Sequence, residues 1–417
     1  MLVYERADVL HFEYFAVFVF NVMQHPLSGY RVIDTTAMVS GPVATQQLAD
    51  QGADVIKVER PGVGDFTRLA ANRHNDMSAS YLNNNRNKRS IAIDLKSAGG
   101  RDVLLRMAAS ADVFVQNFRP GVVERLGVGE ADVRAVRPDI VYVSLSGFGE
   151  NGPYAAKPTY DPIIQALSGL ASVQGGSDDN PPRLVRTIVP DKVTAVTAAQ
   201  AITAALLARV KSGEGQHVRL SMLDAVVAFL WSSDMGGQTF VDKPVSAQRA
   251  ASFIDLIYST LDGHISVAVM GDREWHALTR ALERPEWLDD PRFTTPALRD
   301  QNINERLSLI QEVLETRTSA DWLARLESAG VPCAPALTRN ELIAHEQVAA
   351  SDILLTSDHP HAGRLRQARP AARFDKTPPG IRRGAPLLGE HSDEIMTEIG
   401  LSSAEIEALR KDGVIAG

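Results

Sequence analysis

Residues 31–60 read RVIDTTAMVSGPVATQQLADQGADVIKVER, and this stretch decides the fold. The apolar residues of Arg31–Asp34 and of Val55–Glu59 predict two short strands, and Val43–Asp50 predicts a helix between them. Met38–Pro42 predicts the turn that leads from the first strand into the helix. A strand, a helix and a second strand in this order form one βαβ unit, the building block of a parallel sheet.

The same alternation continues along the chain. Further strands are predicted over Arg89–Leu95, Asp112–Asn117 and Asp139–Leu145, and Arg101–Ala109 is predicted to be helical. These strands are nearly continuous apolar runs, which indicates a parallel sheet covered by helices on both faces. The expected fold class is therefore α/β.

Two changes of pattern mark further parts of the chain. Lys192–Arg209 has apolar residues every three or four positions and predicts a long helix. The composition changes after about residue 236, and Asp255–Val269 predicts a hairpin that helices follow. We therefore expect a large domain that begins with residues 26–225, a smaller α+β domain over 245–335, and a C-terminal tail over 345–417.

Residues 1–25 are predicted to form an N-terminal extension that is not a signal peptide. Its apolar run, Phe15–Val22, follows Glu5, Asp8 and Glu13 rather than a basic segment, and no small-residue cleavage site comes after it. We therefore expect a cytoplasmic protein.

The composition excludes several classes of protein. The chain has 417 residues, with 43 Lys and Arg against 51 Asp and Glu, so its net charge is −8 and a general nucleic-acid binder is not expected. A single cysteine, Cys333, excludes an intrachain disulfide framework and a cysteine-based zinc cluster. No stretch reaches the ~18 apolar residues of a membrane-spanning helix. Histidines with metal-ligand spacing are also missing, and His359 and His361 are expected at the surface, so we expect no metal.

Standard nucleotide and hydrolase motifs are absent from the sequence. No G-x-G-x-x-G, Walker A loop or G-x-S-x-G follows a predicted strand. The segment Val55–Lys96, however, carries eight basic and four acidic residues, a local charge of +4. This basic segment suits a small polyphosphate ligand, but from charge alone a solvated face with ordinary salt bridges is the more common explanation.

Two acidic positions stand out by their local context. Asp191 precedes the long helix, where an aspartate is a preferred N-cap and where a carboxylate could also act as a nucleophile toward an activated acyl group. Asp161 follows Tyr160 and precedes a proline, which is typical of an Asx-turn. Local sequence alone favours the N-cap at Asp191 and the turn at Asp161, and capping by Asp191 is compatible with a catalytic role.

A series of motifs in matching order resembles the class III CoA-transferase family, which includes formyl-CoA transferase, carnitine CoA-transferase and α-methylacyl-CoA racemase. The similarity runs from about residue 26 to the end. The motifs are Gly41-Pro42, residues 52–60 (GADVIKVER), 64–68 (GDFTR), 87–91 (NKRSI), 117–121 (NFRPG), 146–149 (SGFG), 213–216 (GEGQ) and 385–391 (APLLGEH).

The resemblance implies a site for CoA or acyl-CoA in the large domain, with no tightly bound cofactor. It implies that Asp191 is the catalytic carboxylate, which forms an aspartyl anhydride and then an aspartyl-CoA thioester. The residues that it implies for CoA binding are Val39, Ser40, Arg60, Ile93, Asp94, Leu95, Lys96, Asn117, Phe118, Arg119, Arg125, Tyr160 and Asp161. The basic segment would then face the phosphates of CoA.

The resemblance also implies an assembly. The large, Rossmann-like domain would be built from the N-terminal half and the C-terminal tail, and two chains would interlock as a homodimer. The substrates would be an acyl-CoA and a small carboxylic acid.

Departures from the family pattern limit the choice of reaction. Tyr160 stands where racemase-like members carry a catalytic histidine, and a tyrosine with a pKa near ~10 is a poor base at neutral pH. Val39 stands where formyl-CoA transferase has a glutamine, which favours a larger or less polar acyl group, such as that of a dicarboxylic acid. CoA transfer through Asp191 is the main hypothesis. The alternatives are an acyl-CoA racemase or epimerase and a non-catalytic acyl-CoA-binding protein.

Overall fold

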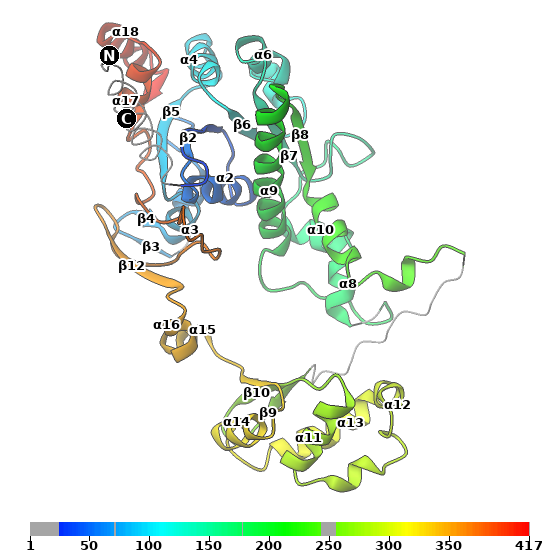
Figure 1. Cartoon of the computed structure of the whole chain (residues 1–417). Coiled ribbons are helices and arrows are strands. Elements are labelled where there is room, and N and C mark those ends of the chain that lie inside the picture. Colours follow the sequence, from blue (N-terminus) through cyan, green and yellow to red (C-terminus); the bar gives the residue numbers. More distant parts are fainter. Residues whose placement is uncertain (1–24, 71, 177, 243–255, 417) are drawn as a thin grey trace, which may run out of the picture. The chain divides into compact units, whose positions relative to one another are not determined.

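The computed structural model describes residues 25–70, 72–176, 178–242 and 256–416 (Figure 1). Nearly all of the predicted N-terminal extension lies outside these residues. The chain divides into two compact units. The larger unit holds residues up to 171 together with 183–235 and 352–417, and the smaller unit holds 172–182 and 236–351.

A seven-stranded sheet forms the centre of the larger unit, in the order β14-β5-β2-β1-β6-β7-β8. Its strands are β1 (Arg31–Asp34), β2 (Asp54–Glu59), β5 (Lys88–Ile93), β6 (Val113–Gln116), β7 (Val141–Ser146), β8 (His217–Ser221) and β14 (Ile415–Ala416). All neighbouring pairs are parallel except β14 with β5. The expectation of an α/β fold with a mainly parallel sheet is confirmed.

Helices cover both faces of this sheet (Figure 1). On one face lie α2 (Ser40–Asp50) and α9 (Val189–Ser212), with α10 (Met222–Trp231) beside α9. On the other face lie α4 (Ala98–Ala109), α5 (Val122–Leu126), α6 (Glu130–Val136), α17 (Ser392–Glu398) and α18 (Ser403–Lys411). Successive strand residues alternate between the two cores, Val32 on the α2 side and Ile33 on the α4 side, as the two-residue period of a strand requires.

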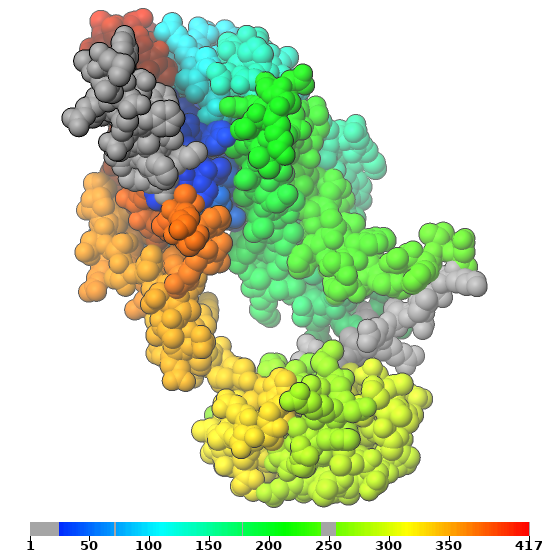
Figure 2. Space-filling model, viewed as in Figure 1, coloured from blue at the N-terminus to red at the C-terminus, as the bar shows by residue number. Residues whose placement is uncertain are grey.

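The C-terminal tail completes the larger unit. Its last strand, β14, pairs with β5 at the edge of the sheet, and Ile395, Met396 and Ile406 pack into the core beneath α4. Figure 2 shows the orange and red residues of the tail beside the blue and cyan of the N-terminal half. The remaining elements of this unit are β3 (Arg73–His74), β4 (Met77–Ser78), α3 (Ala79–Asn84), α7 (Asp161–Leu167), β12 (Leu354–His359) and β13 (Gly363–Ala368), with α8 (Leu170–Gly175) at its boundary.

Several local predictions need correction. The turn predicted over Met38–Pro42 is shorter, because α2 already begins at Ser40, and α9 begins at Val189 rather than at Lys192. His359 is buried rather than at the surface, since its ring lies against the carbonyl of Ala385. The apolar composition of α9 also meets the length and hydropathy of a membrane-spanning helix. Its buried face nevertheless packs against α2 and the sheet, as the core helix of a globular unit does.

The smaller unit is a compact α+β structure around the aromatic residues Trp275, Trp287, Phe293 and Trp322. It has a three-stranded antiparallel sheet, and its hairpin lies within the predicted one. The strands and α-helices are β9 (Ile257–Ser259), β10 (His264–Val267), β11 (Cys333–Pro335), α11 (Asp272–Ala281), α12 (Pro296–Gln301), α13 (Ile303–Leu314), α14 (Ser319–Ser328), α15 (Arg339–Ala344) and α16 (Glu346–Ala350), and the short 3-10 helices are η2 (Gly236–Gln238) and η3 (Pro285–Leu288).

Candidate active site

Asp191 lies in the first turn of α9, where it meets Ser40, the first residue of α2. The Ser40 hydroxyl donates a hydrogen bond to Asp191 Oδ1 at 2.8 Å. The two helices can approach closely because their facing residues are small, including Ala44 and Ala49 on α2 and Ala195 and Ala198 on α9. The N-terminal ends of both helices therefore meet at this carboxylate, and their dipoles favour negative charge there.

The predicted N-cap role of Asp191 is wrong. The residue before the helix is Ile188, and no side chain caps this end. The carboxylate of Asp191 instead faces Ser40 and a cavity. Burial raises the pKa of Asp191, the charge of Asp161 adds to the rise, and the hydrogen bonds from Ser40 lower it only in part. A half-buried carboxylate with a raised pKa is less well solvated and more basic than an exposed aspartate.

Asp161 fixes the backbone of Asp191. It is the first residue of α7 rather than part of a loop, and its Oδ2 accepts from the Asp191 N–H at 3.2 Å. The side chain of Gln165 donates to Asp161 Oδ1 at 2.6 Å and accepts from the Val185 N–H at 2.9 Å. These bonds attach the segment before α9 to α7. Tyr160, the residue before α7, is 66% exposed.

The loop between β1 and α2 is held in an unusual conformation. Met38 has φ = 71°, in the left-handed region that non-glycine residues rarely adopt. The amide of Asn117 secures this loop, since its oxygen accepts from the Ala37 N–H at 3.0 Å and its nitrogen donates to the Ala37 carbonyl at 2.8 Å. Asn117 thereby holds the loop that places Ser40 against Asp191. Strain of this kind is typical of functional sites.

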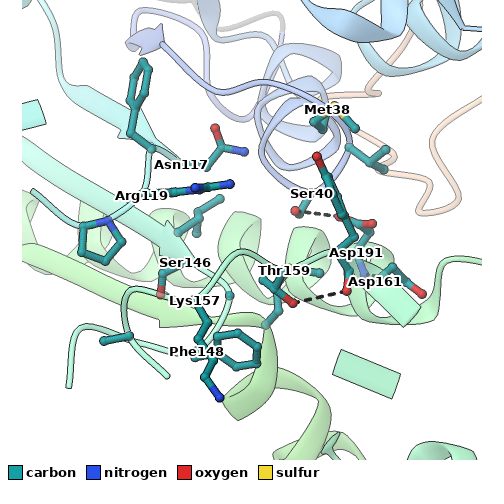
Figure 3. A pocket seen from close by; sticks show the side chains of 18 residues that line it. Met38, Ser40, Asn117, Arg119, Ser146, Phe148, Lys157, Thr159, Asp161 and Asp191 are labelled. Carbon is teal, nitrogen blue, oxygen red and sulfur yellow. Dashed lines mark hydrogen bonds between the residues drawn. The ribbon is translucent and has the colours of Figure 1, made fainter. Parts of the chain in front are cut away.

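Asp191 opens into a cavity of 240 Å³, which we call the Asp191 cavity (Figure 3). Eight of the predicted site residues line it, namely Val39, Ser40, Asn117, Phe118, Arg119, Tyr160, Asp161 and Asp191. Figure 3 shows the guanidinium of Arg119 directed into this cavity. Among the residues that the structure describes, Arg119 has no acidic partner, so its charge is available to a ligand.

A second cavity of 440 Å³, the Arg60 cavity, adjoins the first and shares Met38, Asn117 and Phe118 with it. It contains the other predicted residues Arg60, Ile93, Asp94, Leu95 and Lys96. Arg60 and Lys96 are exposed at the carboxyl ends of β2 and β5. Ligands of parallel α/β sheets bind at this edge.

Arg125 is the one predicted site residue outside both cavities. Its exposed side chain is on α5, whose Val122 and Leu126 line the Arg60 cavity. Sequence reasoning missed Lys157, Thr159 and Met222, which line the Asp191 cavity. A positive charge in the polar loop shortly before Tyr160 is the one signal that could have indicated Lys157.

The prediction that the whole basic segment faces a ligand is wrong. Lys88 is fully buried and donates to Asp34 at 2.9 Å, and Lys57 is fully buried and donates to Asp65 at 3.0 Å. Burial alone would raise the pKa of Asp34, but the charges of Lys88 and Lys57 hold it well below its ordinary range. The bases of this segment that pair with acids are Lys57, Arg68, Arg73, Arg86, Lys88 and Arg89. Arg60 and Lys96 are thus left to face the cavity.

Within the described part of the chain, no group of three or more His, Cys, Asp or Glu side chains could hold a metal ion. The lining of the Asp191 cavity combines the carboxylate of Asp191 with the cationic side chains of Arg119 and Lys157.

Comparison with known proteins is consistent with this geometry. The sequence profile described as CoA-transferase family III matches residues 27–392. The chain belongs to CoA-transferase family III. Relatives of this family III chain include the succinyl-CoA:glutarate CoA-transferase of Mus musculus, which is 32% identical and aligns over 94% of this chain and 90% of its own length. The formyl-CoA:oxalate CoA-transferase of Streptomyces coelicolor is 33% identical, over 93% of this chain and 99% of its own.

Solved structures show the same family III fold. A CaiB/BaiF family protein from Brucella suis superimposes with a TM-score of 0.78 at 29% identity, covering 90% of this chain and 99% of that protein. The named relatives are CoA-transferases, and the family III chain is an enzyme that transfers CoA.

Proposed function

We propose that this enzyme transfers CoA from an acyl-CoA to a free carboxylic acid through covalent intermediates on Asp191. The observation that supports this most directly is the position of Asp191, whose carboxylate lies at the junction of two helix N-termini and lines a cavity. Its raised pKa makes it more basic than an exposed aspartate, and a basic carboxylate is a better nucleophile toward a thioester.

In the first half of the proposed reaction, Asp191 attacks the carbonyl carbon of the donor thioester. The carbon–sulfur bond breaks, CoA leaves as a thiolate, and an acyl-aspartyl anhydride forms. The thiolate then attacks the aspartyl carbonyl of that anhydride. This step releases the donor acid as a carboxylate and leaves an aspartyl-CoA thioester.

In the second half, the acceptor carboxylate attacks the aspartyl-CoA thioester and again expels the CoA thiolate. The new anhydride joins the acceptor acid to Asp191. Attack of the thiolate on the acceptor carbonyl forms the product acyl-CoA and regenerates the free carboxylate. Each step exchanges an acyl group between a sulfur and an oxygen atom, and one thioester is formed for each thioester broken. The reaction therefore consumes no ATP.

The two adjoining cavities support an orientation for CoA. In this proposal the nucleotide lies in the Arg60 cavity, where Arg60 and Lys96 meet its phosphates and Ile93 and Leu95 contact the adenine. The pantetheine arm passes Phe118, which lines both cavities, and the thioester reaches Asp191. Ser40 holds the carboxylate in place through its hydrogen bond of 2.8 Å.

We further propose a dicarboxylic acid as acceptor. The relatives named above are transferases for glutarate and for oxalate, both dicarboxylic acids. One carboxylate of the acceptor would react at Asp191, and the other would pair with the guanidinium of Arg119 in the same cavity.

We also propose a cytoplasmic homodimer. Exposed apolar side chains on α9 and α10 support an interface between two chains. They are Val196, Leu207 and Val210 on α9 and Phe229 and Trp231 on α10. Light scattering on the purified protein should then give twice the chain mass of 45.2 kDa.

The test of the proposed function is an acyl-exchange screen. The protein is incubated with succinyl-CoA, acetyl-CoA and other thioesters plus a pool of mono- and dicarboxylic acids, and new acyl-CoA masses are recorded. New masses that are absent with Asp191→Ala would support transfer. Deuterium entry at the α-carbon in heavy water without new masses would instead favour a racemase.

A further inference from the structure

A chain of four hydrogen-bonded side chains crosses the sheet beside the Asp191 cavity. It consists of Glu130, His217, Ser144 and Gln116, which come from α6, β8, β7 and β6. These side chains line a third cavity, of 250 Å³, which shares Phe118, Arg119, Pro120, Leu145 and Ser146 with the Asp191 cavity. The proposed mechanism uses none of the four.

We call these four side chains the Ser144 relay, and the chemistry of each group indicates which atom donates and which accepts. His217 Nδ1 lies 2.9 Å from Glu130 Oε2, and His217 Nε2 lies 2.8 Å from Ser144 Oγ. Burial lowers the pKa of His217, although Glu130 opposes this effect, so the ring is neutral at neutral pH. Its one N–H therefore donates to the Glu130 carboxylate, and Nε2 accepts the proton of the Ser144 hydroxyl.

The relay continues to the segment that lines both the Asp191 and Arg60 cavities. Gln116 Oε1 accepts from the Phe118 backbone N–H at 2.8 Å, which leaves Gln116 Nε2 to donate to Ser144 Oγ at 2.9 Å. Gln116 is 6% exposed and Ser144 is 8% exposed, so the hydrogen bond between them is largely buried. Ser144 thus orients an amide whose other end holds the backbone of Phe118.

The sequence of Ser, His and Glu also resembles the relay that activates a nucleophilic serine. Here, however, Ser144 lies within the regular strand β7, and its oxygen already accepts from Gln116. A serine engaged on both sides in this way is suited to hold an amide rather than to attack an ester.

We propose that Ser144, oriented by His217 and Glu130, is a positioning residue that fixes the Gln116–Arg119 segment for acyl-CoA binding. The proposal rests on the proposed function, because it takes Phe118 and Arg119 as part of the CoA site. Loss of the Ser144 hydroxyl leaves Gln116 free to rotate, so the segment is no longer held in its binding conformation.

The test compares the full-length wild type with Ser144→Ala and Ser144→Thr. Calorimetric titration with CoA is expected to give a dissociation constant about five- to tenfold higher for Ser144→Ala, the usual effect of leaving a buried hydrogen-bonding group unpaired. The KM for acyl-CoA should rise by the same factor while kcat stays within about twofold. Ser144→Thr keeps the hydroxyl and should restore binding to within about twofold of the wild type.

Ser221→Ala is the matched control, because Ser221 is a buried serine at the end of the neighbouring strand and caps α10 without joining the relay. It should lower the melting temperature and leave CoA binding unchanged. Wild-type CoA affinity in Ser144→Ala, or an equal loss in Ser221→Ala, would overturn the proposal. So would covalent labelling of Ser144 by a fluorophosphonate, which would show a nucleophile.

Because binding is measured directly, a wild type that binds CoA without acyl exchange would count against the proposed function alone. One that does not bind CoA would overturn both.

Discussion

The Ser40 hydroxyl and the Asp191 carboxylate, 151 positions apart in the sequence, meet at 2.8 Å where the N-termini of α2 and α9 come together. The contact joins the first βαβ unit, which carries the loop between β1 and α2, to the helix that carries the proposed catalytic carboxylate. Because a hydrogen bond to the charged form lowers a carboxyl pKa, Ser40 both orients Asp191 and keeps more of it ionised.

The first prediction concerns Ser40→Ala. Loss of the hydroxyl removes one group that lowers the pKa of Asp191, so the acidic limb of the kcat–pH profile should move to higher pH. On the plateau, kcat should fall about tenfold, since the carboxylate is less well oriented. Steady-state kinetics across a range of pH measure both effects. An unshifted acidic limb would show that Ser40 does not influence the ionisation of Asp191.

The second prediction concerns stability and pH. The pKa of Asp191 is raised in the folded chain above its ordinary value of 3.8. The folded chain therefore holds the proton of this carboxyl group more tightly than the unfolded chain does. The resulting stabilisation is complete below that value and is lost as the pH rises through the folded pKa. The neutral variant Asp191→Asn should therefore be more stable than the wild type at pH 7, and the difference should shrink toward pH 4. Urea unfolding at both pH values measures it, and a less stable variant at pH 7 would contradict the burial argument.

The third prediction concerns the acceptor acid. Arg119→Gln removes the proposed partner of the second carboxylate, so the KM for a dicarboxylic acid should rise about tenfold or more. The KM for a monocarboxylic acid of the same chain length should change much less. Equal changes in KM for the two acids would contradict a role of Arg119 in binding the second carboxylate of the acceptor.

The fourth prediction concerns the buried ion pairs behind the Arg60 cavity. Asp34→Asn leaves the fully buried Lys88 without its carboxylate, which should lower the free energy of unfolding by about 3–5 kcal/mol. Asp76→Asn breaks an exposed pair with Arg73 and should leave the free energy of unfolding nearly unchanged, because solvent screens that pair. Equilibrium unfolding in urea compares the two variants. Similar losses in both would show that the buried network does not carry this stability.

Much of the fold and the site could be predicted from the sequence. The apolar strands of residues 31–60 indicated the parallel sheet, and the family resemblance implied residues that do line the two cavities, such as Ser40, Arg60 and Asp191. Ser40 begins α2, Arg60 follows β2, and Asp191 lies in the first turn of α9, so all three stand at or near the end of an element that the apolar pattern indicated.

The basic segment could not be read correctly, because charge in a sequence does not reveal partners that the fold supplies. Lys88 binds Asp34, 54 positions earlier, and neither residue indicates this pair locally. The relay through Ser144 likewise depends on the register of β7 with β6 and β8, which only the assembled sheet fixes. The start of α9 was predicted too late, at Lys192, although the helix begins at Val189. Pro190 was the available signal for the earlier start, because proline is favoured in the first turn of a helix.

Mass spectrometry of the enzyme, quenched in acid during turnover with an acyl-CoA and its acceptor acid, detects covalent catalysis by Asp191 directly. A CoA adduct is expected on the peptide that contains Asp191, and no adduct is expected in Asp191→Asn. Continued acyl exchange with no adduct on Asp191, or with an adduct on another residue, would contradict covalent catalysis by Asp191.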